Sequence, residues 1–321
     1  MNISLQKTYP SAISSPFAMD LIAGLSSTPK SLPCKWFYDE AGSLLFEAIT
    51  KTTEYYPTRV ETRLLESLVD EVVELIPDLA VVIEPGSGSS LKTRILLASQ
   101  PRLQTYMPID ISETFLLETA HQLRRDFPQL AIKPLVADFT ADLHPLALDA
   151  QSQRMVFFPG STIGNFAPVE AQQLLRNIHH WAGKNAWLMM GVDMTQDAGK
   201  LLAAYNDAEG ITARFNRNIL VRANRELEAN FDIEAFEHRT IVNQVEHRVE
   251  MHLVSRQMQA VELQGHTFHF EPGESIHTEN CYKYTQLDFE AIARDCGWEK
   301  LQLWQDNVES SFGVFLFKAI N

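Results

Sequence analysis

The chain has 321 residues, of which 45% are hydrophobic and 21% are charged, and its formal net charge is -14. This composition allows one large α/β domain or a domain with a substantial cap, and the negative charge argues against a nucleic-acid substrate. Three cysteines, Cys34, Cys281 and Cys296, show no CxxC spacing, which indicates a reducing compartment and no structural zinc. No apolar run approaches the roughly 20 residues of a membrane helix, and the N-terminus lacks the pattern of a leader. We expect a cytoplasmic monomer without a membrane partner.

The first 70 residues predict loosely ordered and helical structure. Residues 1–30 are rich in Ser, Pro and Ala, and residues 36–70 read as helix with an interruption at Tyr55-Tyr56-Pro57. Proline either breaks a helix or stands in its first turn, so we expect one helix to end and another to begin here.

Strands and helices alternate from residue 79 onward. A β-branched run over 79–83 (LAVVI) ends in EPGSG, and a helix is expected over 90–99. Further strands are expected over 105–110, 131–136, 155–158 and 186–192, with one helix capped by Ser112 and another opening at Pro168. This rhythm of continuous apolar runs and helices predicts a doubly wound parallel sheet.

The alternation stops near residue 196. Residues 196–280 hold a helical segment and stretches that alternate like half-exposed strands, such as 248–254. A helix over 286–296 and strands over 301–304 and 313–317 then close the chain. We interpret 196–280 as an inserted lobe.

Polar residues and glycines follow three consecutive strands of the predicted sheet. They are Glu84, Gly86 and Gly88 in the first turn, Asp110 at the end of the second strand, and Asp138 and Phe139 after the third. Glycine allows close approach of a ligand, and the two carboxylates can accept hydrogen bonds from ribose hydroxyls and from an adenine amino group. Ligands of open α/β sheets bind at this edge. The missing third glycine disfavours a pyrophosphate-binding turn, but these residues alone do not separate a nicotinamide cofactor from S-adenosylmethionine.

Several long segments together resemble one protein family. They are FYDEAGSLLFEAIT, EYYPTR, GSGSSLKTR, PIDIS, PGSTIGNF, AYNDAEGITARFNRN, NRELEANFD, VEMHL and GESIHTENCYKY. They resemble the histidine-specific methyltransferase family, whose best-known member makes hercynine (trimethylhistidine) for ergothioneine biosynthesis. The resemblance implies a class I methyltransferase core with a Rossmann-like sheet over 61–195 plus 283–321. It also implies a second, α+β substrate-binding domain over 1–60 plus 196–282. The implied reaction is stepwise methylation of the α-amino group of L-histidine by S-adenosylmethionine.

The resemblance also implies roles for individual residues. Positions that contact S-adenosylmethionine are Gly86, Lys92, Asp110, Asp138 and Phe139; positions that hold the substrate amino and carboxylate groups are Tyr38, Tyr55, Asn165 and Tyr205. Met251 would form a wall of the side-chain pocket, and Glu279 would recognise the imidazole ring. Cys281 stands where the family usually has serine. No metal is implied.

Methyl transfer is an in-line displacement that requires alignment, a dry site and an unprotonated amine. A free α-amine is largely protonated near neutral pH, so a proton must leave before each transfer. The hydroxyls of Tyr38 and Tyr55, with a water, can hold the amine and pass that proton outward. Their rings can then attract the quaternary ammonium product by cation–π interaction. We therefore expect these two tyrosines to be the catalytic residues.

Cys281 leaves the substrate open to alternatives. A neutral thiol is a poorer hydrogen-bond partner than a serine hydroxyl, and one neutral bond is worth about 1 kcal/mol, or roughly fivefold in affinity. Glu279 keeps histidine ahead of another aromatic amino acid such as tryptophan. No basic partner of Cys281 is evident, which argues against a covalent nucleophile. A non-catalytic binder of an amino acid or S-adenosylmethionine and a nicotinamide oxidoreductase are the rival readings.

Overall fold

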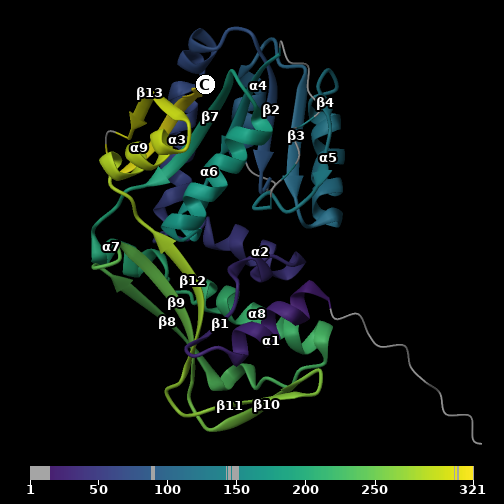
Figure 1. Ribbon diagram of the computed structural model, residues 1–321, viewed down its shortest axis with the longest axis vertical. Coiled ribbons are helices and arrows are strands. Elements are labelled where there is room, and N and C mark those ends of the chain that lie inside the picture. The colour runs from purple at the N-terminus through teal and green to yellow at the C-terminus, as the bar shows by residue number, and fades with distance from the viewer. Residues whose placement is uncertain are drawn as a thin grey trace, which may run out of the picture. The chain divides into compact units, whose positions relative to one another are not determined.

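The computed structural model describes residues 15–87, 91–141, 143, 146, 152–306, 308 and 311–320. The chain divides into two compact units (Figure 1). The smaller unit comprises Met1–Gly42, Ala213–Arg239 and Met251–Glu279, and the larger comprises Ser43–Thr212, Thr240–Glu250 and Asn280–Asn321. Residues 43–60, 196–212, 240–250 and 280–282 thus group with the larger unit, whereas the sequence suggested the second domain. The roles of the two units as substrate and cofactor domains stay predictions.

An eight-stranded sheet forms the centre of the larger unit. Its strands are β2 (Leu79–Pro85), β3 (Thr105–Asp110), β4 (Ala131–Ile132), β5 (Leu135–Val136), β6 (Gln153–Phe158), β7 (Ala186–Asp193), β13 (Trp298–Gln305) and β14 (Phe312–Ala319). Their order is β13-β14-β7-β6-β2-β3-β4, with β5 also paired to β3. Strands β2 to β7 run parallel, and β14 pairs antiparallel with both β7 and β13. The predicted doubly wound α/β fold is confirmed, and the two expected closing strands, β13 and β14, pair antiparallel with each other.

Helices cover both faces of this sheet. Helices α6 (Pro168–Ala182) and α9 (Gln286–Asp295) share one hydrophobic cluster with alternate residues of β2, β6, β7 and β14. Helix α3 (Tyr56–Leu75) contacts α4 (Leu91–Ser99) and β14 with buried residues outside that cluster, while α5 (Glu113–Asp126) packs on β3 and β4. In Figure 1, α6 crosses in front of the strands. Strands covered on both faces need continuous apolar runs, and β7 is buried at every position.

Of three local expectations, one is confirmed and two change in detail. Helix α3 follows α2 (Glu40–Ile49) and begins at Tyr56 with Pro57 in its first turn, as the proline predicted. The strand expected over 131–136 is two short strands separated at 133–134, because Pro134 has no N–H to donate to a ladder. Ser112 occupies the N-cap of α5 as expected, but its side chain makes no capping hydrogen bond.

The remaining elements include a second, four-stranded sheet of order β1-β12-β9-β8 and a separate hairpin. Their bounds are α1 (Pro16–Ser26), β1 (Lys30–Ser31), η1 (Cys34–Phe37), α7 (Ala198–Ala204), α8 (Ile211–Leu227), η3 (Ile233–Ala235), β8 (Phe236–Asn243), β9 (Arg248–Ser255), β10 (Gln259–Leu263), β11 (His266–Phe270) and β12 (Ser275–Tyr282). Aromatic contacts build the smaller unit's core, with Phe236 and Phe270 at 5.3 Å between ring centroids. Phe37 packs on Phe215 of α8 at 4.8 Å.

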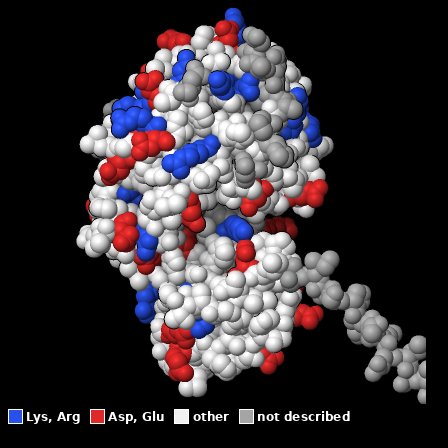
Figure 2. All heavy atoms as spheres, viewed as in Figure 1, with Lys and Arg blue, Asp and Glu red and all other residues white. Residues whose placement is uncertain are grey.

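Charges of both signs are interspersed on the face drawn in Figure 2, which shows no extended basic area. The expectation that nucleic acid is not a substrate stays a prediction. Within the described residues, no helix combines the length and the apolar character that crossing a membrane requires.

The buried Glu61 carboxylate on α3 contacts both the loop after β6 and the strand β7. Glu61 is 1% exposed, pairs with Lys92 Nζ at 2.7 Å, and accepts the backbone N–H of Gly160 at 2.8 Å. A Cβ atom built on Gly191 of β7 would lie 1.9 Å from the Glu61 carboxylate. Only glycine at position 191 therefore leaves room for this ion pair.

We expect Gly191→Ala to lower the free energy of unfolding by about 2 kcal/mol or more, because it displaces a buried, paired charge. Urea denaturation would measure this change. Gly199→Ala is the matched control, since its Cβ would meet Asp197 only at an ordinary 3.4 Å. A Gly191→Ala protein as stable as Gly199→Ala would contradict the packing described.

Candidate functional site

The carboxyl ends of the parallel strands place three predicted residues side by side. Gly86 follows β2, Asp110 ends β3, and Asp138 comes two residues after β5. The Gly86 N–H donates to the carbonyl of Ile109 at 2.8 Å, and Asp110 pairs with Val136 in the ladder. The sequence therefore located this edge correctly, although Gly88 lies outside the described residues.

The turn after β2 is shaped for close approach. Gly86 has a φ of 66°, in the left-handed region that favours glycine, and a Cβ there would lie 3.3 Å from the Phe139 ring. Phe139 makes edge contacts with Phe158 and Phe166 at 5.8 and 6.5 Å. A backbone without a side chain beside an aromatic ring suits the flat base of a nucleoside.

Two carboxylates flank this turn with defined orientations. Oδ1 of Asp110 accepts the Ser112 N–H at 2.8 Å, and Oδ1 of Asp138 accepts the N–H and hydroxyl of Thr140 at 2.9 and 2.5 Å. Burial raises the pKa of Asp110, and the backbone N–H of Ser112 partly opposes this effect. Acceptors held in this way fit the hydroxyl and amino donors of an adenosine group.

Lys92 has a different environment from the one that the resemblance implied. Its ammonium is paired with Glu61 and would lie 3.6 Å from a Cβ on Gly160, in the loop after β6. The side chain is therefore committed to an internal ion pair. Contact between Lys92 and the cofactor stays a prediction.

Four of the predicted substrate-binding residues gather within the larger unit. Tyr55 caps the start of α3 and Tyr205 the end of α7, with ring centroids 6.3 Å apart. The Tyr205 oxygen lies 2.8 Å from Cys281 Sγ. Asn165 ends the short helix η2 (Thr162–Asn165), which packs closely on the cysteine, because a Cβ on Gly164 would lie 3.2 Å from its sulfur. The structure thus brings residues from four distant segments to one place.

Sequence reasoning missed the charged pair beneath this cluster. Lys283 Nζ lies 2.7 Å from Asp193 Oδ2 and 3.3 Å from Cys281 Sγ, so the cysteine does have a basic partner. The Tyr56 hydroxyl donates to Asp193 at 2.6 Å. The sequence did carry one signal for this pair. Asp193 directly follows the fully apolar run over 186–192, and an acid buried at the end of such a strand needs a partner.

The pair is charged near neutral pH. Burial alone would lower the pKa of Lys283, but the Asp193 carboxylate, together with the nearby Cys281, Tyr205 and Tyr56, outweighs burial and holds that pKa well above its ordinary value. Burial would likewise raise the pKa of Asp193, but the attraction of Lys283 leaves it lowered. The pair therefore stabilises the fold over a wide pH range, from below the ordinary aspartate pKa to above the ordinary lysine pKa.

The smaller unit carries the other three predicted residues. The Tyr38 ring packs on Phe215 with centroids 5.4 Å apart. Met251 on β9 and Glu279 on β12 are 2% and 8% exposed, and the Thr278 hydroxyl donates to the Met251 carbonyl at 3.0 Å. Their two strands are thus adjacent, and Glu279 is a buried acid rather than a surface one.

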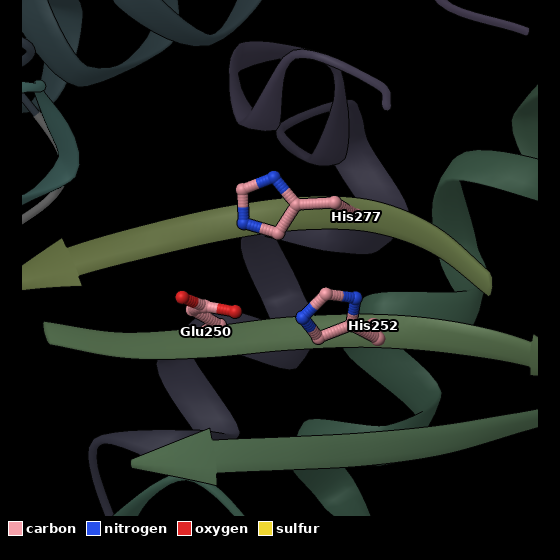
Figure 3. Close-up of side chains that lie close together, drawn as sticks. All are labelled: Glu250, His252 and His277. Carbon is pink, nitrogen blue, oxygen red and sulfur yellow. The ribbon is translucent and has the colours of Figure 1, made fainter. Parts of the chain in front are cut away.

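One further group of polar side chains lies on the four-stranded sheet. Each of Glu250, His252 and His277 offers one potential metal-ligand atom, and these three atoms lie within 4.8 Å of one another (Figure 3). The two imidazole centroids are 5.0 Å apart. Glu250 Oε1 already accepts bonds from Arg248 and Asn243, at 2.8 and 3.0 Å. The neighbouring guanidinium opposes binding of a further cation, so we assign no metal to this group.

Comparison with known proteins gives a consistent result. A family model described as "Histidine-specific methyltransferase, SAM-dependent" matches residues 17–319. The "Histidine N-alpha-methyltransferase" of Mycobacterium tuberculosis (strain CDC 1551 / Oshkosh) is 37% identical over 302 residues, which cover 92% of this chain and 93% of that protein. "Ergothioneine biosynthesis protein 1" of Neurospora crassa is 32% identical over 201 residues, which cover 61% of this chain and 23% of that protein.

Among solved structures, an S-adenosylmethionine-dependent methyltransferase from Clostridium acetobutylicum ATCC 824 has a TM-score of 0.50 with 10% identity. The match covers 86% of this chain and 98% of that one. At this identity the likeness concerns the fold alone, which is that of S-adenosylmethionine-dependent methyltransferases.

Glu84 on β2 generates a prediction about pH and stability. It is fully buried and accepts bonds from the hydroxyls of Thr93 and Tyr106 at 2.8 and 2.6 Å. Burial raises its pKa from 4.5 to about 7, despite these bonds. The folded protein therefore holds a proton that the unfolded chain has lost between these two pH values.

We expect the stability of the wild type to fall, relative to Glu84→Gln, as the pH rises from about 4.5 to 7. The relative loss should be on the order of 1 kcal/mol per pH unit. Urea denaturation at a series of pH values measures it, with exposed Glu66→Gln on α3 as the control. Parallel stability profiles of the wild type and Glu84→Gln would contradict the raised pKa.

Proposed function

Because the chain belongs to the histidine-specific, S-adenosylmethionine-dependent methyltransferase family, we propose that it methylates the α-amino nitrogen of L-histidine in steps, to the trimethyl betaine hercynine. The observation that carries the proposal is the family match over residues 17–319. Relatives include both histidine N-alpha-methyltransferases and ergothioneine biosynthesis proteins, which fits hercynine as a precursor of ergothioneine.

S-adenosylmethionine supplies an electrophilic methyl group bound to a sulfonium. The residues at the sheet edge fit this cofactor, since the turn at Gly86 carries no side chain and faces the Phe139 ring. Asp110 would accept the ribose hydroxyls, and Asp138 would accept the adenine amino group. The protein's contribution is to align donor and acceptor and to keep water away.

The reacting amine must lose a proton before each transfer. Tyr55 is held in place by its ring contacts with Phe46 and Tyr205, at 6.2 and 6.3 Å between centroids, and by a bond from Arg59 to its carbonyl. Its hydroxyl would hold the amine and accept its proton for transfer to water. The Tyr38 hydroxyl is a second candidate for this role. Asn165 can donate to the substrate carboxylate, and the Tyr205 ring would line the same place.

Recognition of the substrate side chain would fall to Met251, Glu279 and Cys281. A buried carboxylate such as Glu279 accepts a hydrogen bond from a ring N–H strongly, because little water competes with it. Loss of a bond to a charged group costs roughly 1.5–3 kcal/mol, or about 10- to 100-fold in kcat/KM.

The direct test incubates the purified protein with S-adenosylmethionine and, in separate reactions, histidine, its α-N-mono- and dimethyl forms, tryptophan and tyrosine. Mass spectrometry should show one, two and three methyl groups added to histidine. Methylation of tryptophan instead would move the substrate to another aromatic amino acid. Absence of turnover with every acceptor, despite cofactor binding, would favour the non-catalytic binder.

A variant tests the recognition step. We expect Glu279→Gln to lower kcat/KM for histidine about 10- to 100-fold, because the amide is a neutral and weaker acceptor. The matched control is Glu262→Gln on β10, where the side chain is exposed. Steady-state kinetics with histidine as the varied substrate measure both, and equal values for the two variants would remove Glu279 from the recognition step.

A further inference from the structure

Lys283 has one acceptor for each of its three N–H groups. Its Nζ lies 2.7 Å from Asp193 Oδ2, 3.1 Å from the Tyr205 oxygen and 3.3 Å from Cys281 Sγ. The side chain is 2% exposed. An ammonium can only donate, so the Tyr205 oxygen and the Cys281 sulfur both act as acceptors toward it.

The phenol proton of Tyr205 then has a defined direction. Its oxygen already accepts from Lys283, and it lies 2.8 Å from Cys281 Sγ, so the hydroxyl donates to the sulfur. The buried sulfur, 5% exposed, therefore accepts one hydrogen bond from a cation and one from a phenol. Both interactions favour the ionised form of a thiol over the neutral form.

The other titratable groups nearby leave this arrangement in place. Asp193 is itself stabilised by three donors, since the Tyr56 hydroxyl and the Thr195 N–H bond it at 2.6 and 3.1 Å in addition to Lys283. Burial raises the pKa of Tyr205, and Tyr55 lies beside it. Burial also raises the pKa of Tyr284, the other phenol that interacts with Cys281. These phenols are uncharged near neutral pH. The acids near Cys281 are Asp193 and Glu279, which lies two residues earlier on β12; a negative charge on either opposes a thiolate, whereas the bond from the Lys283 ammonium favours it.

We infer that Lys283 and Tyr205 hold Cys281 as a thiolate at neutral pH, and that this thiolate is the acceptor for one ring N–H of the substrate. The second half of the inference rests on the proposed function. Glu279, two residues earlier on β12, would accept the other ring N–H. Lys283 is then a positioning residue, and the pocket selects a ring with two N–H donors, which is an imidazolium cation.

This inference reverses the effect expected from the sequence. A neutral cysteine in place of serine would weaken histidine binding, whereas a thiolate is a charged and stronger acceptor. An indole offers only one N–H, so tryptophan would leave one anionic acceptor without a donor. An imidazolium loses one of its two N–H protons near pH 6.5. Affinity for histidine should therefore fall as the pH rises above that value.

The experiment needs no substrate. Thiolate absorbance at 240 nm is recorded from pH 5 to 9 for the wild type and for Cys281→Ser, and the difference reports Cys281. We expect a single step with its midpoint below pH 7, whereas a free thiol titrates near pH 8.5. A difference spectrum with its midpoint at or above pH 7, or with no step, would overturn the inference.

Three further variants test which residues produce this titration step. Cys296→Ser should leave it unchanged, because burial raises the pKa of Cys296 and keeps that thiol neutral over this range. Lys283→Met should move the midpoint upward by more than one pH unit. Because that variant leaves Asp193 buried without its cation and can fail to fold, Tyr205→Phe, which removes one donor, provides a second upward shift. An unmoved midpoint in a folded variant of either kind would contradict the role assigned to that residue.

Calorimetric titration with histidine then separates this inference from the proposed function. At pH 6.5 we expect Cys281→Ser to bind histidine about fivefold more weakly than the wild type. A thiolate titration step without histidine binding would overturn the assignment of histidine as the substrate, while the thiolate itself would stand. Histidine methylation without a thiolate step would overturn the inference and leave the proposed function standing.

Discussion

The buried ion pair between Asp193 and Lys283 connects most of the elements that line the candidate site. Asp193 ends β7 and is bonded by Tyr56 of α3, while its backbone N–H donates to Ser161 beside η2. Lys283 follows β12 and reaches both Tyr205 and Cys281. A buried charge is tolerated only with a partner. Asp193 and Lys283 come from different segments, so each segment needs the other to pair its charge, and this need holds the segments together.

The proposed cofactor edge depends on a second constraint, the common direction of the six parallel strands β2 to β7. Their carboxyl ends lie at one edge of the sheet, and loops at that edge can carry polar side chains without disturbing the core. Gly86 keeps the first turn free of a side chain, and the Glu61–Lys92 pair holds the loop at Gly160 through the bond from its N–H to Glu61.

Most of the architecture was predictable because its signals are local. Continuous apolar runs marked the parallel strands, and Pro57 marked the start of α3. One expected strand is divided for a physical reason, because Pro134 has no N–H to donate to the ladder. Ser112 occupies the expected N-cap, but its hydroxyl does not bond the helix backbone. Lys92 shows the limit for site residues, since its commitment to Glu61 depends on a residue of another helix.

By itself, the sequence determined the fold class, the family and the residues that follow the strands, because periodicity, turn chemistry and long motifs are properties of neighbouring positions. Only the tertiary structure decided what surrounds Cys281. The basic partner that the chain seemed to lack is two residues away along it, but its ammonium reaches the sulfur only because Asp193 and Tyr205 place it there. Hydrogen-bond direction and charge depend on all neighbours at once, and segments distant in sequence supply those neighbours.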